Sequence, residues 1–219
     1  MRLKVEKVVK ETQDAVSLYF KNPTLFRKIK YKSGQFLTLN LKINNKTEKR
    51  AYSFSSSPYV DKDLRITIKK VEKGIVSNYI YDHVKAGDTI KIESPRGSFF
   101  HEPDEKESRT IVLFGAGSGV TPVLSIAKTV LEKEPNSNVL FFYANRDVKS
   151  IIFKEEIELL SQKYASKLNV IHILENENEK LEQSYKGYLQ QQIVNEVFAK
   201  YKVNTKSCLL YTSPSPRDA

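Results

Sequence analysis

The sequence predicts two successive domains: an antiparallel β-barrel, followed by an α/β domain built on a parallel sheet. Two observations support this fold class. In the first half of the chain apolar and polar residues alternate with a period of two, which is typical of strands with one buried face. In the second half, short continuous apolar runs alternate with amphipathic helical stretches, which is typical of buried parallel strands covered by helices.

The period of two is clearest in residues 37–43 and 64–68, where Leu or Ile fills every second position. Asn44-Asn45-Lys46 and Asp61-Lys62-Asp63 have the residue types of tight turns. Many short strands separated by turns favour an antiparallel barrel. We expect the remaining strands of this half at 4–10, 15–21, 50–55 and 89–93, and one helix at 77–84.

The pattern changes in a polar stretch that contains Pro103, and we place the domain boundary there, between a domain of residues 1–107 and one of residues 108–207. Alternation of strands and helices beyond this point predicts a parallel sheet. We expect strands at 111–114, 139–143 and 170–174, and helices at 121–132, 151–163 and 189–201.

Composition narrows the class of protein. Of the 219 residues 40% are hydrophobic and 28% charged, which favours a packed soluble protein over a disordered one. The start of the chain has no secretory signal, and no apolar run approaches the roughly 18 residues that span a bilayer. A single cysteine, Cys208, excludes a disulfide framework. We therefore expect a cytoplasmic protein without a membrane partner.

The net charge of +10 is concentrated in residues 1–107, which hold 22 Lys and Arg against 14 Asp and Glu. A positive surface raises the encounter rate with acidic partners. The alternative is a solvated, lysine-rich surface that serves no specific partner.

The first candidate site is Arg50-Ala51-Tyr52-Ser53. On a strand Arg50 and Tyr52 share one face, and Ser53 points to the other. Arginine offers a fork of donors suited to a pyrophosphate, and a flavin ring requires a flat apolar partner. The alternative is an ordinary strand with a surface arginine and a packed tyrosine.

The second candidate site is Gly74-Ile75-Val76-Ser77, at the start of the expected helix. Gly74 permits close approach of the backbone, and Ser77 stands where we expect the N-cap. A helix N-terminus offers free N–H groups and a positive dipole end to an anion. A simple cap without a ligand is the alternative.

The third and strongest candidate is the turn Gly115-Ala116-Gly117-Ser118-Gly119-Val120-Thr121-Pro122, which follows an apolar strand and opens a helix. Glycines in this context let backbone N–H groups meet a phosphate, and Pro122 suits a first helical turn. The third glycine of the usual dinucleotide fingerprint would fall at Val120, so the pattern is a different one.

Asn145 and Arg146 close the next strand, at the sheet edge where cofactors bind. An arginine there can pair with a 2′-phosphate, whereas an acidic residue would favour the 2′-hydroxyl. The alternative is a surface salt bridge between Arg146 and Asp147. Ser150 either helps to hold the same phosphate or caps the following helix.

The order of these segments resembles the ferredoxin–NADP reductase superfamily along residues 1–207. The segments that carry the resemblance are Gly34-Gln35-Phe36, Arg50–Pro58, Gly74–Ser77 and Gly115–Pro122. Within that superfamily, Arg50–Pro58 and Tyr143–Arg146 are most similar to the reductase components of phenylacetyl-CoA oxygenase and related oxygenase systems.

The resemblance implies a flavin-binding barrel, a nicotinamide domain, and electron transfer from NADPH, with NADH as the alternative, through FAD to a one-electron acceptor. It implies that Tyr52 and Ser53 are catalytic, with Tyr52 against the flavin and Ser53 near its N5 atom. The residues that it implies for FAD are Arg50, Tyr52, Ser53, Gly74, Val76 and Ser77. Those that it implies for the nicotinamide nucleotide are Gly115, Gly117, Ser118, Thr121, Pro122, Asn145 and Arg146.

The expected acceptor is an acidic electron carrier such as ferredoxin or flavodoxin, or an oxygenase component. A 2Fe–2S cluster is expected only if a C-terminal ferredoxin domain has been lost. The first alternative function is a non-catalytic, flavin-binding electron-transfer subunit, and the second is the reductase part of a flavohaemoglobin-type fusion. A basic nucleic-acid binder is the third, and it would leave the Gly115–Pro122 turn unexplained.

The last residues depart from the superfamily, whose final strand ends in Cys-Gly-Pro. Cys208 is not followed by Gly-Pro. Residues 208–218 instead match the translation of a transposon-end adapter used in preparing sequencing libraries. We therefore expect residues 208–219 to be a non-native tail, and the nucleotide-binding domain to be truncated and to lack the last part of its sheet. A chain truncated in this way should bind FAD better than it turns over NADPH. The alternative is a divergent, proline-rich C-terminus.

Overall fold

The computed structural model describes residues 1–21, 29–176, 181, 184–205 and 208–212, the last range as backbone only. They form two compact units, Met1–Glu102 with Leu124–Thr129, and Pro103–Val123 with Val130–Ala219. The sequence pattern suggests a boundary between residues 107 and 108. The units instead divide at Glu102 and Pro103, and the first unit also includes the middle of one helix. No helix in the described part of the chain is long and apolar enough to cross a membrane.

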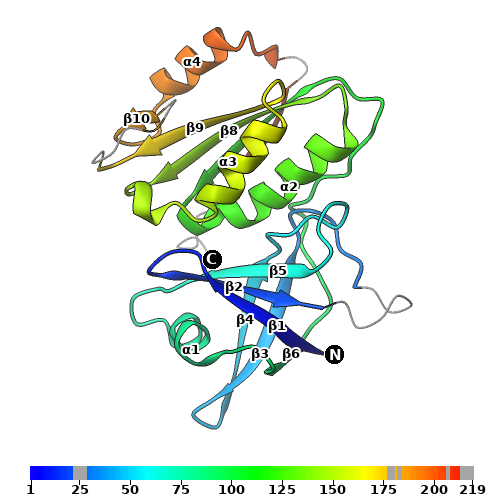
Figure 1. Ribbon diagram of the computed structural model, residues 1–219, viewed down its shortest axis with the longest axis vertical. Coiled ribbons are helices and arrows are strands. Elements are labelled where there is room, and N and C mark those ends of the chain that lie inside the picture. Colours follow the sequence, from blue (N-terminus) through cyan, green and yellow to red (C-terminus); the bar gives the residue numbers. More distant parts are fainter. Residues whose placement is uncertain (22–28, 177–180, 182–183, 206–207, 213–219) are drawn as a thin grey trace. The chain divides into compact units, whose positions relative to one another are not determined.

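The first unit is an antiparallel six-stranded sheet with the strand order β4-β3-β6-β1-β2-β5 (Figure 1). A bridge between Phe54 and Ile66 joins the chain after β4 to β5, so the two edge strands meet. The predicted antiparallel barrel is confirmed. Its elements are β1 (Arg2–Lys10), β2 (Ala15–Phe20), β3 (Phe36–Ile43), β4 (Lys46–Ser53), β5 (Leu64–Lys69), α1 (Ile75–His83) and β6 (Thr89–Ile92).

The hairpin of β3 and β4 follows the sequence pattern only in part. On β3, Leu37, Leu39 and two further alternate residues are buried, as the period of two predicts. Asn44 and Asn45 have φ values of 49° and 62°, the left-handed conformation that two-residue hairpin turns require. β4 begins at Lys46 rather than at the predicted residue 50, because this edge strand is polar along most of its length and carries no apolar alternation.

The second unit is a parallel five-stranded sheet with the strand order β10-β9-β8-β7-β11. Figure 1 shows α2 and α3 on one face of this sheet and α4 on the other. The predicted parallel α/β domain is confirmed. Its elements are β7 (Thr110–Ala116), α2 (Val120–Lys133), β8 (Asn138–Asn145), α3 (Lys154–Lys163), β9 (Leu168–Leu174), β10 (Ser184–Lys186), α4 (Gln191–Lys200) and β11 (Cys208–Thr212).

Two details of this unit differ from the sequence prediction. Helix α3 begins at Lys154 rather than at residue 151, because a capping turn between Asp147 and Ser150 and a left-handed Phe153 (φ 63°) precede it. The short strand β10 has no counterpart in the prediction, since three residues are too few for a period to be visible.

The edge strand β11 also differs from expectation. We expect from the sequence that the sheet lacks its last strand, but the backbone of Cys208–Thr212 pairs in parallel with β7, from Thr110 to Phe114. Leu, Tyr and Thr favour strands, and backbone pairing requires no more than that. The presence of this strand therefore does not distinguish a native segment from an adapter-derived one. The expectation of a non-native tail stays a prediction. Residues 213–219 lie outside the described part of the chain.

Candidate functional site

The strand β4 carries the first candidate residues at the edge of the six-stranded sheet. Arg50 lies opposite Leu39 and Tyr52 lies opposite Leu37, so both share the face of β3 that bears the buried leucines. Ser53 lies opposite Phe36, on the other face. Within the described residues β3 is the only strand that pairs with β4. Arg50 is exposed, and Tyr52 is partly buried.

Arg50 and Tyr52 differ in how firmly they are held. The Arg50 guanidinium donates to the Lys49 carbonyl at 2.7 Å and lies 3.5 Å from the Glu48 carboxylate. Both side chains of that ion pair are partly exposed, so the pair contributes little stability. Tyr52 packs on the barrel core, and this burial raises the pKa of its hydroxyl to about 12, against the opposing charge of Arg50. Tyr52 thus stays neutral even in mildly alkaline solution, and its ring packs against the core.

The segment that follows β4 is buried and hydrogen-bonded. Ser55, Ser56 and Ser57 are each at most 1% exposed. The buried Arg65 donates through Nε to the Ser55 hydroxyl at 3.0 Å and through its guanidinium to the Ser55 carbonyl at 3.0 Å. Tyr31 stacks on Phe54 and shares a 2.7 Å hydrogen bond with the Ser56 hydroxyl. These contacts fix the backbone directly after the candidate residues Tyr52 and Ser53.

The middle of α2, which belongs to the first unit, continues this network. The Ser125 hydroxyl donates to the Ser56 carbonyl at 2.6 Å, and the Ser57 and Thr129 hydroxyls lie 2.8 Å apart. Lys128, only 3% exposed, forms a 2.7 Å ion pair with Asp61. Sequence reasoning singles out neither Lys128 nor Arg65, because a buried lysine or arginine has no sequence signal of its own.

Helix α1 provides the second set of candidate residues, and one expectation about it was wrong. Its N-cap is Gly74, which makes no side-chain capping bond, and not Ser77. Ser77 is the third helical residue, and its hydroxyl accepts the Val71 N–H at 3.2 Å, outside the helix. A Cβ on Gly74 would lie 2.5 Å from that hydroxyl, so local packing requires a glycine here. Val76 faces the core, so only its backbone N–H is available to a ligand.

The glycine turn has the predicted strand–turn–helix context. Residues Gly117–Gly119 form a single 3₁₀ turn between β7 and α2, and Gly117 has a positive φ of 48°. The Thr121 hydroxyl donates to the Ser118 carbonyl at 3.0 Å, which closes the turn onto the helix. Pro122 lies in the first turn of α2, where its missing N–H removes no helical bond.

The end of β8 lies beside this turn, because Ala116 and Ala144 pair across β7 and β8. The buried Tyr143 hydroxyl lies 3.2 Å from the Gly117 carbonyl and accepts the Ile152 N–H at 3.2 Å. Tyr143 therefore ties the glycine turn to the chain before α3. Asn145 is 7% exposed, and neither of its amide atoms has a hydrogen-bond partner among the described residues.

The residues after Asn145 are already engaged with one another. The Arg146 Nε lies 3.2 Å from Oδ2 of Asp147. Asp147 and Ser150 form a reciprocal capping box around the short 3₁₀ turn Val148–Ser150, whereas the N-cap of the following helix α3 is Phe153, so the expectation that Ser150 caps that helix was wrong. Burial alone would raise the pKa of Asp147, but hydrogen bonds from Arg146 and Ser150 outweigh it and hold that pKa below its usual range.

These residues fit the two groups that the resemblance implies. A buried amide without a partner costs roughly 1–3 kcal/mol, so Asn145 favours an external ligand at the end of β8. On the first unit, the N–H groups of the first turn of α1 meet no side-chain cap at Gly74, and the Arg50 guanidinium is weakly paired. Both are suited to an anionic group such as a pyrophosphate.

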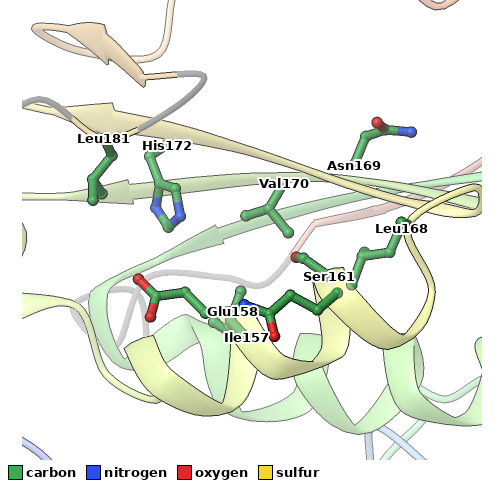
Figure 2. Close-up of a pocket in the computed structure, with 10 residues that line it drawn as sticks. Ile157, Glu158, Ser161, Leu168, Asn169, Val170, His172 and Leu181 are labelled. Carbon is green, nitrogen blue, oxygen red and sulfur yellow. The ribbon is translucent and has the colours of Figure 1, made fainter.

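A separate pocket lies between α3 and β9 of the second unit (Figure 2). Its volume is about 530 Å³, and Glu158, Ser161 and His172 contribute polar groups to its wall. The Nδ1 atom of His172 is buried without a partner among the described residues, and burial lowers the pKa of the imidazole to about 4. None of the predicted cofactor residues lines this pocket.

Comparison with known protein families assigns both halves of the chain. The family model of the oxidoreductase FAD-binding domain matches residues 2–101. The family model of the oxidoreductase NAD-binding domain matches residues 113–212. Together they cover nearly the whole chain, and β11 falls within the second match.

Individual relatives agree with the family models. The chain is 40% identical over 176 residues to the ferredoxin reductase component of 3-ketosteroid-9-alpha-monooxygenase from Rhodococcus rhodochrous, a match that covers 80% of this chain and 49% of the relative. It is 33% identical over 176 residues to a subunit of 1,2-phenylacetyl-CoA epoxidase from Escherichia coli, with 80% and 49% covered. The chain thus spans about half the length of the curated relatives it matches.

A solved structure supports the fold. The flavohem-like FAD/NAD binding domain of nitric oxide dioxygenase from Vibrio cholerae superposes with a TM-score of 0.75 over 96% of this chain and 97% of that one. Its sequence identity is 22%, so the likeness concerns the fold alone.

Proposed function

The chain belongs to the family of oxidoreductases that join an FAD-binding domain to an NAD-binding domain, the ferredoxin–NADP reductase superfamily, and we propose that it passes electrons from a reduced nicotinamide nucleotide through FAD to a one-electron acceptor. The observation that carries the proposal is Asn145. Its buried, unpartnered amide stands beside a glycine turn in the NAD-binding half, where a nucleotide ligand would satisfy it.

On the FAD-binding half, Arg50 would hold the FAD pyrophosphate, together with the backbone N–H groups of Val76 and Ser77 behind Gly74. The Tyr52 ring would lie flat against the flavin. The weak ion pair of Arg50 and the uncapped start of α1 support these roles, because both leave donors open to an anion.

On the NAD-binding half, residues at the carboxyl ends of β7 and β8 would bind the nucleotide together. The backbone of Gly115, Gly117 and Ser118 would approach the nucleotide phosphates, with Thr121 and Pro122 shaping the turn. Asn145 would bond to the nucleotide directly, since no described residue satisfies its amide.

When bound, FAD supplies the redox chemistry, because it takes two electrons from the nicotinamide and returns them singly. The protein's own contribution is to orient the rings. Ser53 would offer its hydroxyl to flavin N5, and the buried network of Ser55, Ser56 and Arg65 would keep that hydroxyl in place. The raised pKa of Tyr52 keeps its ring neutral beside the flavin.

For the acceptor we propose an acidic electron carrier, such as ferredoxin or flavodoxin, or an oxygenase component. The monooxygenase relative is a ferredoxin reductase component, and the excess of Lys and Arg in residues 1–107 suits an acidic partner. A 2Fe–2S cluster would be the acceptor only in a protein that carries a ferredoxin domain after this chain.

The test is a single-turnover reaction of the FAD-loaded chain with NADH and with NADPH under anaerobic conditions. Loss of the oxidised flavin absorbance with either nucleotide is the expected result. Ser53→Ala, measured in protein saturated with FAD, should slow that reduction by about tenfold or more. A chain that binds FAD but is reduced by neither nucleotide would overturn the proposal in favour of a non-catalytic flavin-binding subunit.

A further inference from the structure

Two carboxylates, those of Asp147 and Glu175, follow the ends of β8 and β9 beside Arg146. Arg146 follows β8 and already donates through Nε to Asp147 at 3.2 Å. Asp147 stays ionised, because its hydrogen bonds from Arg146 and Ser150 lower its pKa. One donor of Arg146 is therefore already used by a carboxylate before a ligand arrives, although the Arg146 side chain is 64% exposed.

Glu175 adds the second carboxylate. Asn145 pairs with Leu174, the last residue of β9, and the pairing continues beyond it. The Glu175 N–H donates to the Asn145 carbonyl at 3.1 Å, and the Asn176 N–H donates to the Arg146 carbonyl at 2.7 Å. This register aligns Glu175 with Arg146 on neighbouring strands. The Glu175 side chain is exposed, and no hydrogen bond to its carboxylate is found in the described part of the chain.

Ser150 cannot compensate for these charges. Its N–H donates to Oδ1 of Asp147 at 2.8 Å, and its hydroxyl donates to the Asp147 carbonyl at 2.7 Å. Both donors of Ser150 are thus committed to the capping box, and the residue is only 5% exposed. A phosphate at this edge would find an arginine already paired with a carboxylate, and a serine whose donors are already used.

We propose that this chain selects the nucleotide without a 2′-phosphate, NADH over NADPH, and that Glu175 and Asp147 determine the choice. The inference rests on the proposed function, since it assumes that a nicotinamide nucleotide binds along this edge. It revises the expectation that Arg146 would hold a 2′-phosphate.

The chemistry of discrimination is direct. A 2′-phosphate brings nearly two negative charges toward two carboxylates, and like charges a few ångströms apart repel each other. A ribose 2′-hydroxyl instead donates a hydrogen bond, and a carboxylate is an acceptor with several free lone pairs. The Glu175 carboxylate is therefore suited to the ribose diol and opposed to the phosphate ester.

The test compares equilibrium binding of 5′-AMP with adenosine 2′,5′-bisphosphate, and of NAD⁺ with NADP⁺, by calorimetry on the FAD-loaded chain. The wild type should bind the ligands without a 2′-phosphate about tenfold more tightly. Glu175→Gln should narrow that ratio severalfold, and the double variant Glu175→Arg with Asp147→Asn should invert it. The Asp147→Asn side chain keeps an oxygen that accepts the Ser150 N–H, so the capping box survives.

The matched control is Glu132→Gln, in the last turn of α2. It makes the same change of net charge at the amino-terminal end of the parallel strands. The last turn of α2 lies at that end because the helix runs back from the end of β7 to the start of β8. This variant should leave the ratio unchanged.

The outcomes separate the two proposals. Wild-type preference for NADP⁺, or equal effects of Glu175→Gln and Glu132→Gln, would overturn the selectivity while leaving the proposed function intact. Failure of all four ligands to bind would remove the nucleotide site itself, and the proposed function would fall with it.

Discussion

The polar groups behind β4 are partnered with one another, whereas the buried amide of Asn145 at the end of β8 has no partner among the described residues. In the first region Ser55, Ser56 and Arg65 form a closed set of hydrogen bonds. A fully satisfied network of buried polar groups rigidifies the backbone around it, which suits a cofactor that stays bound. An unpartnered amide is suited to a ligand that exchanges, because each binding event supplies the missing hydrogen bond. The comparison therefore favours a resident flavin and a nucleotide that comes and goes.

The largest expected effect of a substitution is on the closed network. Lys128→Met removes one partner of the buried ion pair with Asp61, and should lower the free energy of unfolding by about 3 kcal/mol. The Asp61 side chain is 30% exposed, which places the effect at the low end for such pairs. Urea unfolding of the FAD-loaded chain measures it.

The matched control for this prediction is Lys154→Met. It breaks an exposed pair with Glu158, for which we expect about 0.5 kcal/mol or less. Equal losses of unfolding free energy in the two variants would mean that the buried network behind β4 stabilises the fold no more than an exposed ion pair does. The contrast between the two regions would then be wrong for the flavin side.

His172 predicts a pH dependence in the second unit. Burial lowers the pKa of its imidazole in the folded protein to about 4, the opposing charge of Glu158 notwithstanding. The unfolded chain, with a pKa near 6.5, therefore binds more protons between pH 4 and 6.5, and stability falls as pH decreases through this window. Between pH 7 and pH 5 the loss from this group should be about 2 kcal/mol.

Urea unfolding at both pH values measures this loss, and His172→Gln should abolish it. His83→Gln, which changes an exposed histidine of α1, is the control. If both variants flatten the pH dependence equally, the buried imidazole of β9 is not its source.

A substitution of Arg50 tests the flavin site directly. Arg50→Ala should weaken FAD binding about tenfold or more, because a hydrogen bond to a charged group contributes about 1.5–3 kcal/mol. Lys49→Ala removes a neighbouring cation from the opposite face of β4, where it pairs with Glu93 at 2.8 Å. Fluorescence titration with FAD should show the loss only in the first variant, and a similar loss in both would indicate general attraction to a positive surface.

The sequence was most informative where a period or a motif crosses several residues. The alternation of Leu37 to Ile43 and the strand–turn–helix context of Gly115–Pro122 predicted both sheets and the glycine turn. The bounds of polar edge strands are harder to predict. Most residues of β4 are polar and at least partly exposed, so the strand shows no alternation and its start at Lys46 differs from the prediction. Ser77 was misplaced because an N-cap assignment depends on backbone dihedrals that residue type alone does not determine.

Contacts between residues far apart in the chain could not be predicted from the sequence. The pairing of Lys128 with Asp61 and the alignment of Glu175 with Arg146 join residues far apart in the chain, and no spacing rule relates them. The neighbourhood of Arg146 therefore becomes visible only with the register of β9, which aligns Glu175 with it.

The smallest expected effect concerns Asn145 at the nucleotide site. Its substitution should raise or preserve the stability of the free protein and lower the affinity for the nucleotide. Asn145→Leu removes a buried amide that no described residue satisfies, so the nucleotide-free protein should be as stable as the wild type or more stable by about 1 kcal/mol. The same substitution should weaken NAD⁺ and NADP⁺ binding alike by severalfold, because the lost hydrogen bond does not involve the 2′ position. Asn138→Leu, at the exposed start of the same strand, should do neither. A variant that loses stability without losing nucleotide affinity would show that the Asn145 amide serves the fold, and the contrast between a satisfied flavin side and an unsatisfied nucleotide side would no longer hold.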